Sequence, residues 1–339
     1  MNHSNLINLC NELELGTPLS PPKRVHGGLL HTMWRVNTEE ASYAIKQLSP
    51  DIKLKNKSII ENYNLTEEIA TRFVERGIPT VCALKPSGKY LVLIHGTGFL
   101  IYPWVDAKPL HKDTVSKSHA LKIAEIIAQM HLINLAVPEI KEPEFDIHTN
   151  DSLEELFSKA QSYHCPFTAA LTEHQKTITA INTNYQNMLP LLKQSSVVSH
   201  GDLDQKNVLW DKNDNPILID WECARKLNPT YEIVNASLDW SGITTHFNQA
   251  IFIKMIQTYS HSGGHLDKTV LEAAFNAVLG NWINWMVYNI ERACTREESE
   301  QKTLGIEQVN QVLQTMIQLI NIIPDLIASF EEKDNSKNA

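Results

Sequence analysis

The chain has 339 residues and a formal charge of −9, from 30 Lys and Arg against 39 Asp and Glu, with 42% hydrophobic and 20% charged residues. These fractions exclude a disordered or fibrous chain, and the acidic balance argues against a protein that coats nucleic acid, which needs a basic face. The acidity is compatible with a cationic small-molecule substrate, although a mildly acidic surface also simply keeps proteins soluble. At this length a single core approaches its limit, so the chain is expected to form two lobes.

The five cysteines, at positions 10, 82, 165, 223 and 294, are scattered and show no CxxC or Cys/His ligand spacing. This pattern predicts reduced thiols in a cytoplasmic protein, with neither a disulfide framework nor a zinc site. Residues 1–15 lack the continuous apolar core of a signal peptide, and no apolar run approaches the roughly 18 residues of a membrane span. We therefore expect a cytoplasmic protein that binds neither a membrane nor nucleic acid. Nothing in the sequence indicates its oligomeric state.

Residues 1–102 are predicted to be rich in strands. The short apolar runs 29–37 and 42–48 are joined by a polar turn, which is typical of a hairpin. Helical spacing follows over about 58–76, where Gly77 and then Pro79 predict the end of the helix. Further strands are predicted in one short series, at 80–84, 90–94 and 98–102. Together these elements make a small sheet with one helix.

Residues 103–330 are predicted to be mainly helical. An apolar stripe runs over 121–135, and more helical segments follow, at 152–160, 168–189, 231–259, 267–292 and 303–330. Short β-like pieces near 197–198, 208–210 and 217–219 interrupt this series, and the polar residues 331–339 are expected to be a frayed tail. The sequence therefore predicts an α+β chain of two lobes. The first is small, β-rich and N-terminal (1–102), and the second is larger and mainly helical (103–330).

The stretch 199–222 (SHGDLDQKNVLWDKNDNPILIDWE) carries the chemistry. Asp202 and Asn207 are five residues apart on a predicted loop, and Asp220 ends a short strand beyond a hairpin. An Asp that accepts a proton from a hydroxyl, with an Asn and a second Asp as oxygen ligands for Mg²⁺, is what phosphoryl transfer needs. A lone HGD triplet would be a weak signal, whereas this order of HGDxxxxN, hairpin and Ile-Asp is specific.

This stretch resembles the catalytic and metal loops of the aminoglycoside phosphotransferase and choline kinase superfamily, whose members are relatives of the protein kinases. The resemblance spans roughly residues 25–240. It implies a bilobal, protein-kinase-like fold and an enzyme that transfers the γ-phosphoryl group of ATP, with Mg²⁺, to a hydroxyl of a small molecule. In that family the residue matching Asp202 is the catalytic base, and those matching Asn207 and Asp220 hold Mg²⁺.

The N-terminal lobe carries the rest of the resemblance. Gly27 and Gly28 resemble the loop that covers the phosphates. Tyr102 and Trp104 resemble the hinge that meets the adenine ring. Lys46 resembles the strand lysine that contacts the α- and β-phosphates. Glu67, on the following helix, resembles the glutamate that pairs with this lysine. Glu68 is the alternative partner, because the sequence does not fix the rotation of the helix.

Two departures argue against a protein kinase. Gly201 stands where protein kinases carry an Arg, and Asp220 is followed by Trp221-Glu222 rather than Phe-Gly. The acceptor stays open: an aminoglycoside-like molecule is favoured, with choline or ethanolamine, homoserine or a sugar as alternatives. A nucleotide-binding pseudokinase that serves as an interaction module is a further alternative. The presence of Lys46 together with the three loop residues argues against it. The choice between ATP and GTP also stays open.

Some residues admit two interpretations. Trp282 and Trp285 share a helical face, which either packs in the core or forms an aromatic wall for a cationic or sugar acceptor. Asp204 either positions the substrate or faces solvent. His200 is expected to brace the loop and His131 to be a hydrogen-bonded core residue.

Overall fold

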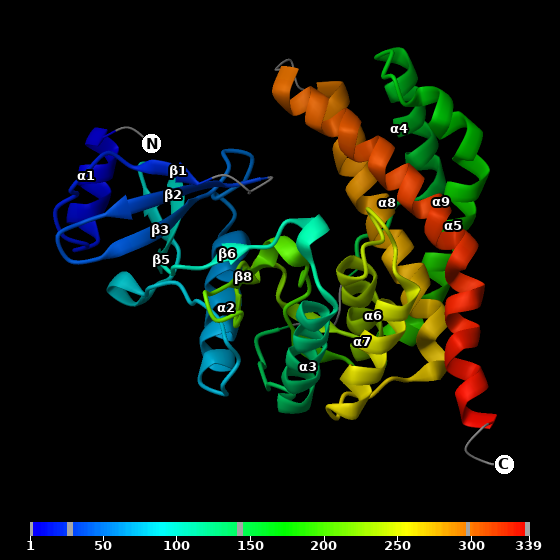
Figure 1. The fold of residues 1–339 in the computed structure, drawn as a ribbon. Coiled ribbons are helices and arrows are strands. Elements are labelled where there is room, and N and C mark those ends of the chain that lie inside the picture. Colours follow the sequence, from blue (N-terminus) through cyan, green and yellow to red (C-terminus); the bar gives the residue numbers. More distant parts are fainter. Residues whose placement is uncertain (1–2, 26–29, 141–144, 296–298, 336–339) are drawn as a thin grey trace. The chain divides into compact units, whose positions relative to one another are not determined.

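A computed structural model describes residues 3–25, 30–140, 145–295 and 299–335 of the chain (Figure 1). The chain divides into two compact units. The first comprises Met1–His111, Leu135–Glu139 and His200–Arg225, and the second comprises Lys112–Asn134, Ile140–Ser199 and Lys226–Ala339. The α+β class is as predicted. The stretch with the phosphoryl-transfer motif, which the sequence analysis places in the lobe 103–330, belongs to the first unit.

The first unit is built on a five-stranded antiparallel sheet in the order β1-β2-β3-β5-β4. Its strands are β1 (Lys23–Val25), β2 (Thr32–Asn37), β3 (Ser42–Gln47), β4 (Val92–Ile94) and β5 (Thr97–Pro103). The predicted hairpin is β2 and β3, and the hydroxyl of Thr38 closes its turn by accepting the N–H groups of Glu40 and Ala41. This turn sets the register that places Lys46 on the central strand.

The two faces of this sheet are covered by different helices. Val36 and Ile45 pack with Leu9 of α1 (His3–Glu12) on one face. Lys46 pairs with Leu100 across β3 and β5, so both point to the other face, where α2 (Lys57–Val74) packs. The alternation of side chains along β3 therefore places Ile45 and Lys46, both buried, on opposite faces of the sheet.

The helix predicted near residues 58–76 is α2. It begins at Asn56, whose side-chain oxygen accepts the N–H of Ser58. It ends before Gly77, whose φ of +86° only glycine adopts readily and which lets the N–H of Ile78 reach the carbonyl of Phe73. The strand predicted at 80–84 is absent from this described segment. A single bridge joins Thr80 of this segment to Leu218. The segment has strand-forming residues, but among the described residues it lacks a neighbouring strand to pair with over its length.

A second, three-stranded sheet carries the motif in the first unit. Its order is β6-β8-β9, from β6 (Lys108–Pro109), β8 (Val208–Trp210) and β9 (Pro216–Leu218). The carboxylate of Asp211 accepts the N–H groups of Asn213 and Asn215, which folds the turn between β8 and β9. Short 3₁₀ turns η3 (Gln205–Asn207) and η4 (Trp221–Cys223) flank this hairpin, and the others are η1 (Pro86–Gly88), η2 (Lys112–Thr114) and η5 (Lys268–Val270).

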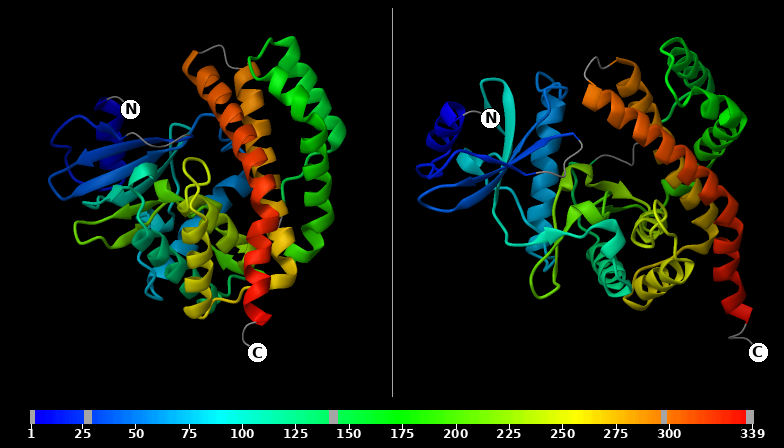
Figure 2. Two further views of the ribbon diagram at one scale, coloured as in Figure 1. Left: turned by 45° about the vertical axis from the view of Figure 1, so that its right-hand side comes forward. Right: turned by 45° about the horizontal axis from the view of Figure 1, so that its top comes forward.

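The second unit is mainly helical. Its helices are α3 (Lys117–Ile133), α4 (Asn150–Ser162), α5 (Thr168–Leu192), α6 (Pro229–Trp240), α7 (Gln249–His261), α8 (Leu271–Thr295) and α9 (Ser299–Asn335), with a short pairing of β7 (Val197–Ser199) and β10 (Arg225–Leu227). α8 packs against α9, α5 and α6, and α9 runs alongside α8 in both views of Figure 2. The single helix predicted at 231–259 is two, because Gly242 at φ +82° ends α6 and the N–H of Ile243 returns to the carbonyl of Leu238.

α9 differs from the prediction at its end and in its length. It stays helical to Asn335, so the expected frayed tail begins as helix, and residues 336–339 lie outside the described residues. Within it, Glu300–Phe330 is long and apolar enough to cross a membrane by length and composition, which the sequence analysis did not anticipate. Core helices of folded proteins pass the same test, and α9 buries Val309, Leu313 and Met316. This helix alone is therefore weak support for a membrane span.

His131 is the expected hydrogen-bonded core histidine of the second unit. Its Nδ1 lies 2.8 Å from the hydroxyl of Tyr259, and its Nε2 lies 2.7 Å from a carboxylate oxygen of Glu232. All three residues are buried. The group ties α3 to α6 and α7 through polar contacts inside the helical core.

Candidate active site

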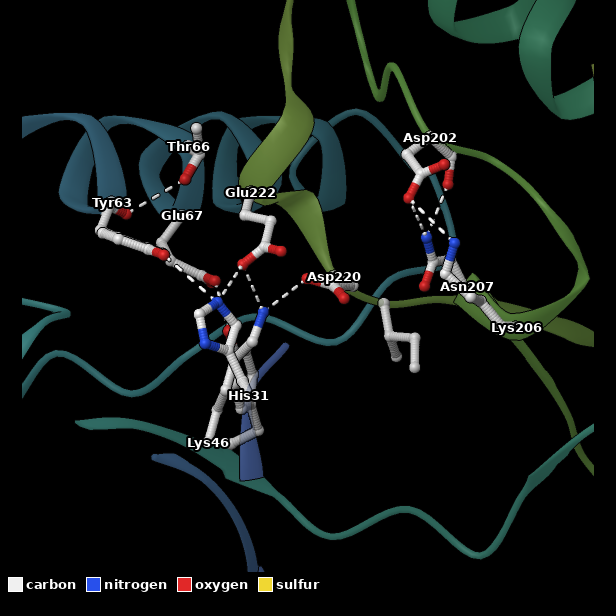
Figure 3. Close-up of polar contacts among 12 residues, drawn as sticks. His31, Lys46, Tyr63, Thr66, Glu67, Asp202, Lys206, Asn207, Asp220 and Glu222 are labelled. Carbon is white, nitrogen blue, oxygen red and sulfur yellow. Dashed lines mark hydrogen bonds and ion pairs between the residues drawn. The ribbon is translucent and has the colours of Figure 1, made fainter. Parts of the chain in front are cut away.

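The loop predicted to be catalytic holds Asp202 and Asn207 together. The Asn207 amide donates to the Asp202 carboxylate at 2.8 Å and to the Asp202 backbone carbonyl at 2.7 Å (Figure 3). Asn207 is buried, whereas the Asp202 side chain is 40% exposed. Five residues of loop therefore fold so that a fixed amide orients a carboxylate that solvent or substrate can reach.

His200 braces this loop, as expected. Its Nε2 lies 3.0 Å from the carbonyl of Ile219, and its Nδ1 lies 3.3 Å from the N–H of Asp202. A carbonyl only accepts and an N–H only donates, so the proton is assigned to Nε2. The ring is fully buried beside Trp221, at 4.7 Å between ring centroids. His200 thus links the start of the loop, at Asp202, to the strand that leads to Asp220.

Lys206 also contacts the carboxylate of Asp202, and the sequence analysis missed this contact. Its amine lies 3.3 Å from Asp202 Oδ2 and 2.6 Å from Asp204 Oδ2. Asp204 also accepts the backbone N–H of Lys206 at 2.9 Å, so one side chain holds both ends of the lysine. Burial alone would lower the pKa of Lys206, but Asp202 and Asp204 raise it. Asp204 therefore neither simply faces solvent nor is seen to position a substrate: it holds the Lys206 cation beside Asp202.

Lys46 lies between two carboxylates from the end of the motif. Its amine is 2.6 Å from Asp220 Oδ1 and 2.7 Å from Glu222 Oε2 (Figure 3). Burial alone would lower the pKa of Lys46, but the charges of Asp220 and Glu222 hold it above its usual range. Glu222 responds in the opposite direction: burial works to raise its pKa, whereas the hydrogen bond from His31 and the charge of Lys46 lower it to about 2. Lys46 and Glu222 are therefore both charged at neutral pH.

The predicted pair of Lys46 with Glu67 is not formed. One oxygen of Glu67 accepts the hydroxyl of Tyr102 at 2.5 Å and the other accepts the N–H of Ala83 at 3.0 Å. Burial raises the pKa of Glu67, against the lowering effects of the Tyr102 and Ala83 hydrogen bonds and of the nearby charge of Lys46. The helix rotation thus makes Glu67 the inward residue, but its carboxylate is bound to the hinge.

Glu68 is not the partner of Lys46 either. It lies on the outer side of α2, where its carboxylate accepts from Lys85, from Tyr90 and, at 3.4 Å, from Arg72. These hydrogen bonds lower its pKa although burial works the other way.

Tyr102 and Trp104, the residues predicted to form the hinge, lie within the described residues, and both side chains donate hydrogen bonds. The Tyr102 hydroxyl donates to Glu67, while the Trp104 indole N–H donates to Asp106 at 3.1 Å. The guanidinium of Arg35 lies 4.3 Å from the centroid of the Trp104 ring. Gly27 and Gly28 lie outside the described residues.

Asp220 and Asn207 offer oxygen atoms suited to a divalent cation. Asp220 has a φ of +67°, a left-handed conformation that Asp tolerates better than most residues, and it turns the carboxylate at the end of β9. Because the Asn207 amide nitrogen is turned to Asp202, its oxygen is directed elsewhere. In the part of the chain that the structure describes, no group of three or more His, Cys, Asp or Glu side chains could hold a metal alone. This donor set fits Mg²⁺, which takes one or two protein oxygens and completes its shell with phosphates and water.

Three residues of this site escaped the sequence analysis. Lys206 lies within the motif, and its alternation with Asp202 and Asp204 was a usable signal. Glu222 was noticed only as a departure from the protein kinase pattern, although a carboxylate two residues after Asp220 has the same strand-end location. His31 carried no signal, because its contact with Glu222 joins positions 191 residues apart.

The aromatic face of α8, in the second unit, is partly engaged. The rings of Trp285 and Tyr288 are stacked, with centroids 5.4 Å apart, and the Trp285 indole N–H donates to Gln308. Arg292 lies over the Tyr288 ring at 4.8 Å and donates to its hydroxyl at 3.1 Å. Trp282 is partly exposed. The face is therefore not fully packed in the core, and two of its aromatic rings already contact other side chains of the chain.

The sheet-based first unit and its Lys, Asp, Asn and Asp side chains define an enzyme of the small-molecule kinase type. The chain belongs to the phosphotransferase enzyme family, whose model matches residues 22–262. The superfamily inferred from the motifs is thereby confirmed. Among curated proteins, no sequence matches the chain.

Solved structures share the fold at low sequence identity. A spectinomycin phosphotransferase in complex with ADP and spectinomycin has a TM-score of 0.65 at 13% identity, covering 93% of this chain and 98% of its own. An amicoumacin kinase in complex with AMP-PNP and Ca²⁺ has a TM-score of 0.62 at 12% identity, covering 93% and 94%. The choline kinase of Streptococcus pneumoniae has a TM-score of 0.60 at 14% identity, covering 93% and 99%. These likenesses confirm the kinase-like fold.

Proposed function

We propose that the chain transfers the γ-phosphoryl group of ATP, with Mg²⁺, to a hydroxyl group of a small molecule. One observation carries the proposal: a single unit holds a carboxylate fixed by an amide, Asp202 with Asn207, and a lysine paired with a second carboxylate, Lys46 with Asp220. The family match and the nucleotides named in the related structures support the same chemistry.

Asp202 orients the acceptor hydroxyl and accepts its proton. Its carboxylate is held by the Asn207 amide and the Lys206 amine, which leaves an exposed edge for the hydroxyl. A positioned base of this kind contributes roughly 10²–10⁴ in rate. Phosphoryl transfer requires mainly positioning and charge stabilisation, so a rigid loop suits it.

Asn207 and Asp220 would hold Mg²⁺ through their side-chain oxygens, and Lys46 would contact the phosphates. Bound there, the ion would neutralise charge on the β- and γ-phosphates. Tyr102 and Trp104 would flank the adenine ring, with Glu67 fixing the Tyr102 hydroxyl. Gly27 and Gly28 would cover the phosphates.

For the acceptor we favour an aminoglycoside-like molecule. The related structure with spectinomycin bound has a TM-score of 0.65, against 0.60 for the choline kinase, and the acidity of the chain is compatible with a cationic acceptor. Choline, ethanolamine, homoserine and sugars remain the alternatives. ADP release should be measured with a panel of all five classes, and strict dependence on one class identifies the acceptor.

The central test is Asp202→Asn. We expect turnover to fall by roughly 10²–10⁴ while the dissociation constant for ATP stays within about twofold, since Asp202 contacts the acceptor rather than the nucleotide. Asp151→Asn, at an exposed position in the first turn of α4, is the matched control and should leave both unchanged. Undiminished turnover in Asp202→Asn would refute the mechanism. Tight ATP binding without ADP release for any acceptor would favour the pseudokinase module.

A further inference from the structure

The amine of Lys46 makes two charge-assisted hydrogen bonds, one to Asp220 and one to Glu222. Only one of these carboxylates has a second partner. Glu222 Oε2 also accepts from His31 at 3.1 Å, whereas Lys46 is the partner of Asp220 in the part of the chain that the structure describes. Glu222 is therefore held in place by two side chains and Asp220 by one, so Asp220 separates from Lys46 more readily than Glu222 does.

His31 holds Glu222 from the other side. Its Nδ1 lies 3.1 Å from the backbone N–H of Ser49 and must accept that hydrogen, which assigns the proton of the neutral ring to Nε2. Nε2 therefore donates to Glu222. Tyr63 adds a hydroxyl 3.3 Å from the same nitrogen. Since His31 is 8% exposed, the tautomer and the direction of this donor are fixed by buried contacts.

A bound nucleotide with its metal would draw Asp220 away from Lys46 and leave Glu222 in contact with it. In the proposed function Asp220 would be an oxygen ligand of the metal, and its bond to Lys46 would then weaken. Glu67 is turned away from Lys46, because its carboxylate accepts from Tyr102 and Ala83. Glu222 is left as the anion that holds the lysine in place.

We propose that Glu222, braced by His31, is the carboxylate that orients Lys46 toward the nucleotide phosphates, in the position that the helix residue Glu67 was expected to fill. Glu222 and His31 are positioning residues, since they act through Lys46. The assignment rests on the proposed function, because it assumes that Lys46 contacts a nucleotide. It gives Glu67 a different task, which is to hold the hinge tyrosine.

The test is calorimetric titration of the full-length chain with ATP, once with Mg²⁺ and once with EDTA. Glu222→Ala is expected to weaken ATP binding about tenfold with Mg²⁺, which is the loss of one hydrogen bond to a charged group, and by a smaller but measurable factor with EDTA, where Asp220 stays paired with Lys46. Glu222→Gln keeps an acceptor oxygen without the charge and should show a smaller loss. Glu68→Gln, which alters a carboxylate on the outer side of α2, is the matched control and should bind as the wild type does.

His31 is tested by a pair of variants that differ in one donor. His31→Leu removes the N–H that reaches Glu222 and should weaken ATP binding about threefold. His31→Gln places an amide N–H near the position of Nε2 and should restore the affinity. A purely structural role would lower the melting temperature of His31→Leu while ATP affinity stayed equal in the two variants, and that result would overturn the brace.

Other outcomes separate the possible errors. Wild-type affinity in a folded Glu222→Ala variant, or a larger loss in Glu67→Gln than in Glu222→Ala, overturns the assignment. A loss confined to the titration with Mg²⁺ also overturns it, because Glu222 would then be a metal ligand. A wild-type chain that binds no ATP refutes the proposed function itself, and the assignment with it.

Discussion

Glu67 has a structural task in this unit, and its removal is predicted to destabilise the fold. The side chain is 2% exposed, and its two oxygens satisfy the hydroxyl of Tyr102 and the N–H of Ala83. Glu67→Ala leaves both donors without a partner, and a buried unsatisfied group costs about 1–3 kcal/mol. The truncated side chain also loses packing. Against this, the variant no longer has to bury a carboxylate, so we expect a net loss of about 3 kcal/mol in the free energy of unfolding.

Glu67→Gln separates the charge from the hydrogen bonds. The amide oxygen can accept the N–H of Ala83, and the amide nitrogen can donate to the oxygen of Tyr102, since a phenol both donates and accepts. Both buried groups then keep a partner. We therefore expect the free energy of unfolding of this variant to stay within about 1 kcal/mol of the wild-type value.

The pH dependence follows from the direction of the Glu67 pKa. Burial raises this pKa in the folded state, so the folded protein holds the proton more tightly than the unfolded chain does. Its contribution to stability is fully present below the unfolded value of about 4.5 and is lost as the pH rises through the folded pKa. Glu67→Gln has no such titration, so its stability relative to the wild type should improve as the pH rises above about 4.5.

Urea unfolding followed by circular dichroism, at a series of pH values from 4 to 8, measures all three quantities. The reasoning fails if Glu67→Ala and Glu67→Gln are equally stable at pH 7. It also fails if the difference between wild type and Glu67→Gln does not change with pH.

Two further predictions concern other parts of the chain. Lys206→Met should lower kcat about tenfold or more, because Asp202 loses one of the two side chains that orient it; an unchanged kcat in steady-state assays would contradict this. Gly280→Ala should lower the melting temperature, because the added methyl group overlaps the buried ring of Tyr185. Overpacking costs about 1–3 kcal/mol, more than the gain of about 1 kcal/mol from helix propensity, so a higher melting temperature would refute the packing argument.

Local features of the fold were predictable from the sequence, whereas features that need a distant partner were not. The helix ended by Gly77 follows from a spacing pattern and a backbone conformation that a few neighbouring residues decide. The segment 80–84 has the propensity of a strand, yet the only backbone it meets as a bridge is that of Leu218. The break at Gly242 was missed because one glycine inside a long apolar pattern is compatible with either one helix or two.

The site divides in the same way. Asp202 and Asn207 were predicted to lie on one loop, and the hydrogen bond between them joins positions only five residues apart. The bond from Lys46 to Glu222 joins positions 176 residues apart, and no local pattern encodes it. The family resemblance predicted Glu67 as the partner of Lys46 instead. This prediction was wrong because the buried Glu67 carboxylate accepts from its nearest donors, which are Tyr102 and Ala83.

The aromatic face of α8 was one of two interpretations in the sequence analysis, as a wall for a cationic or sugar acceptor, and part of this face is engaged within the chain. A cationic acceptor held by cation–π contact needs an aromatic ring that no other cation already covers. The ring of Tyr288 is covered by Arg292 of the chain itself, and Trp285 is stacked against Tyr288 and donates to Gln308. An amine that bound at Tyr288 would have to displace a guanidinium, at the cost of its hydrogen bond to the Tyr288 hydroxyl. The interpretation of this face as an acceptor wall therefore stays a prediction, and within it Trp282 is the partly exposed ring that neither of these contacts covers.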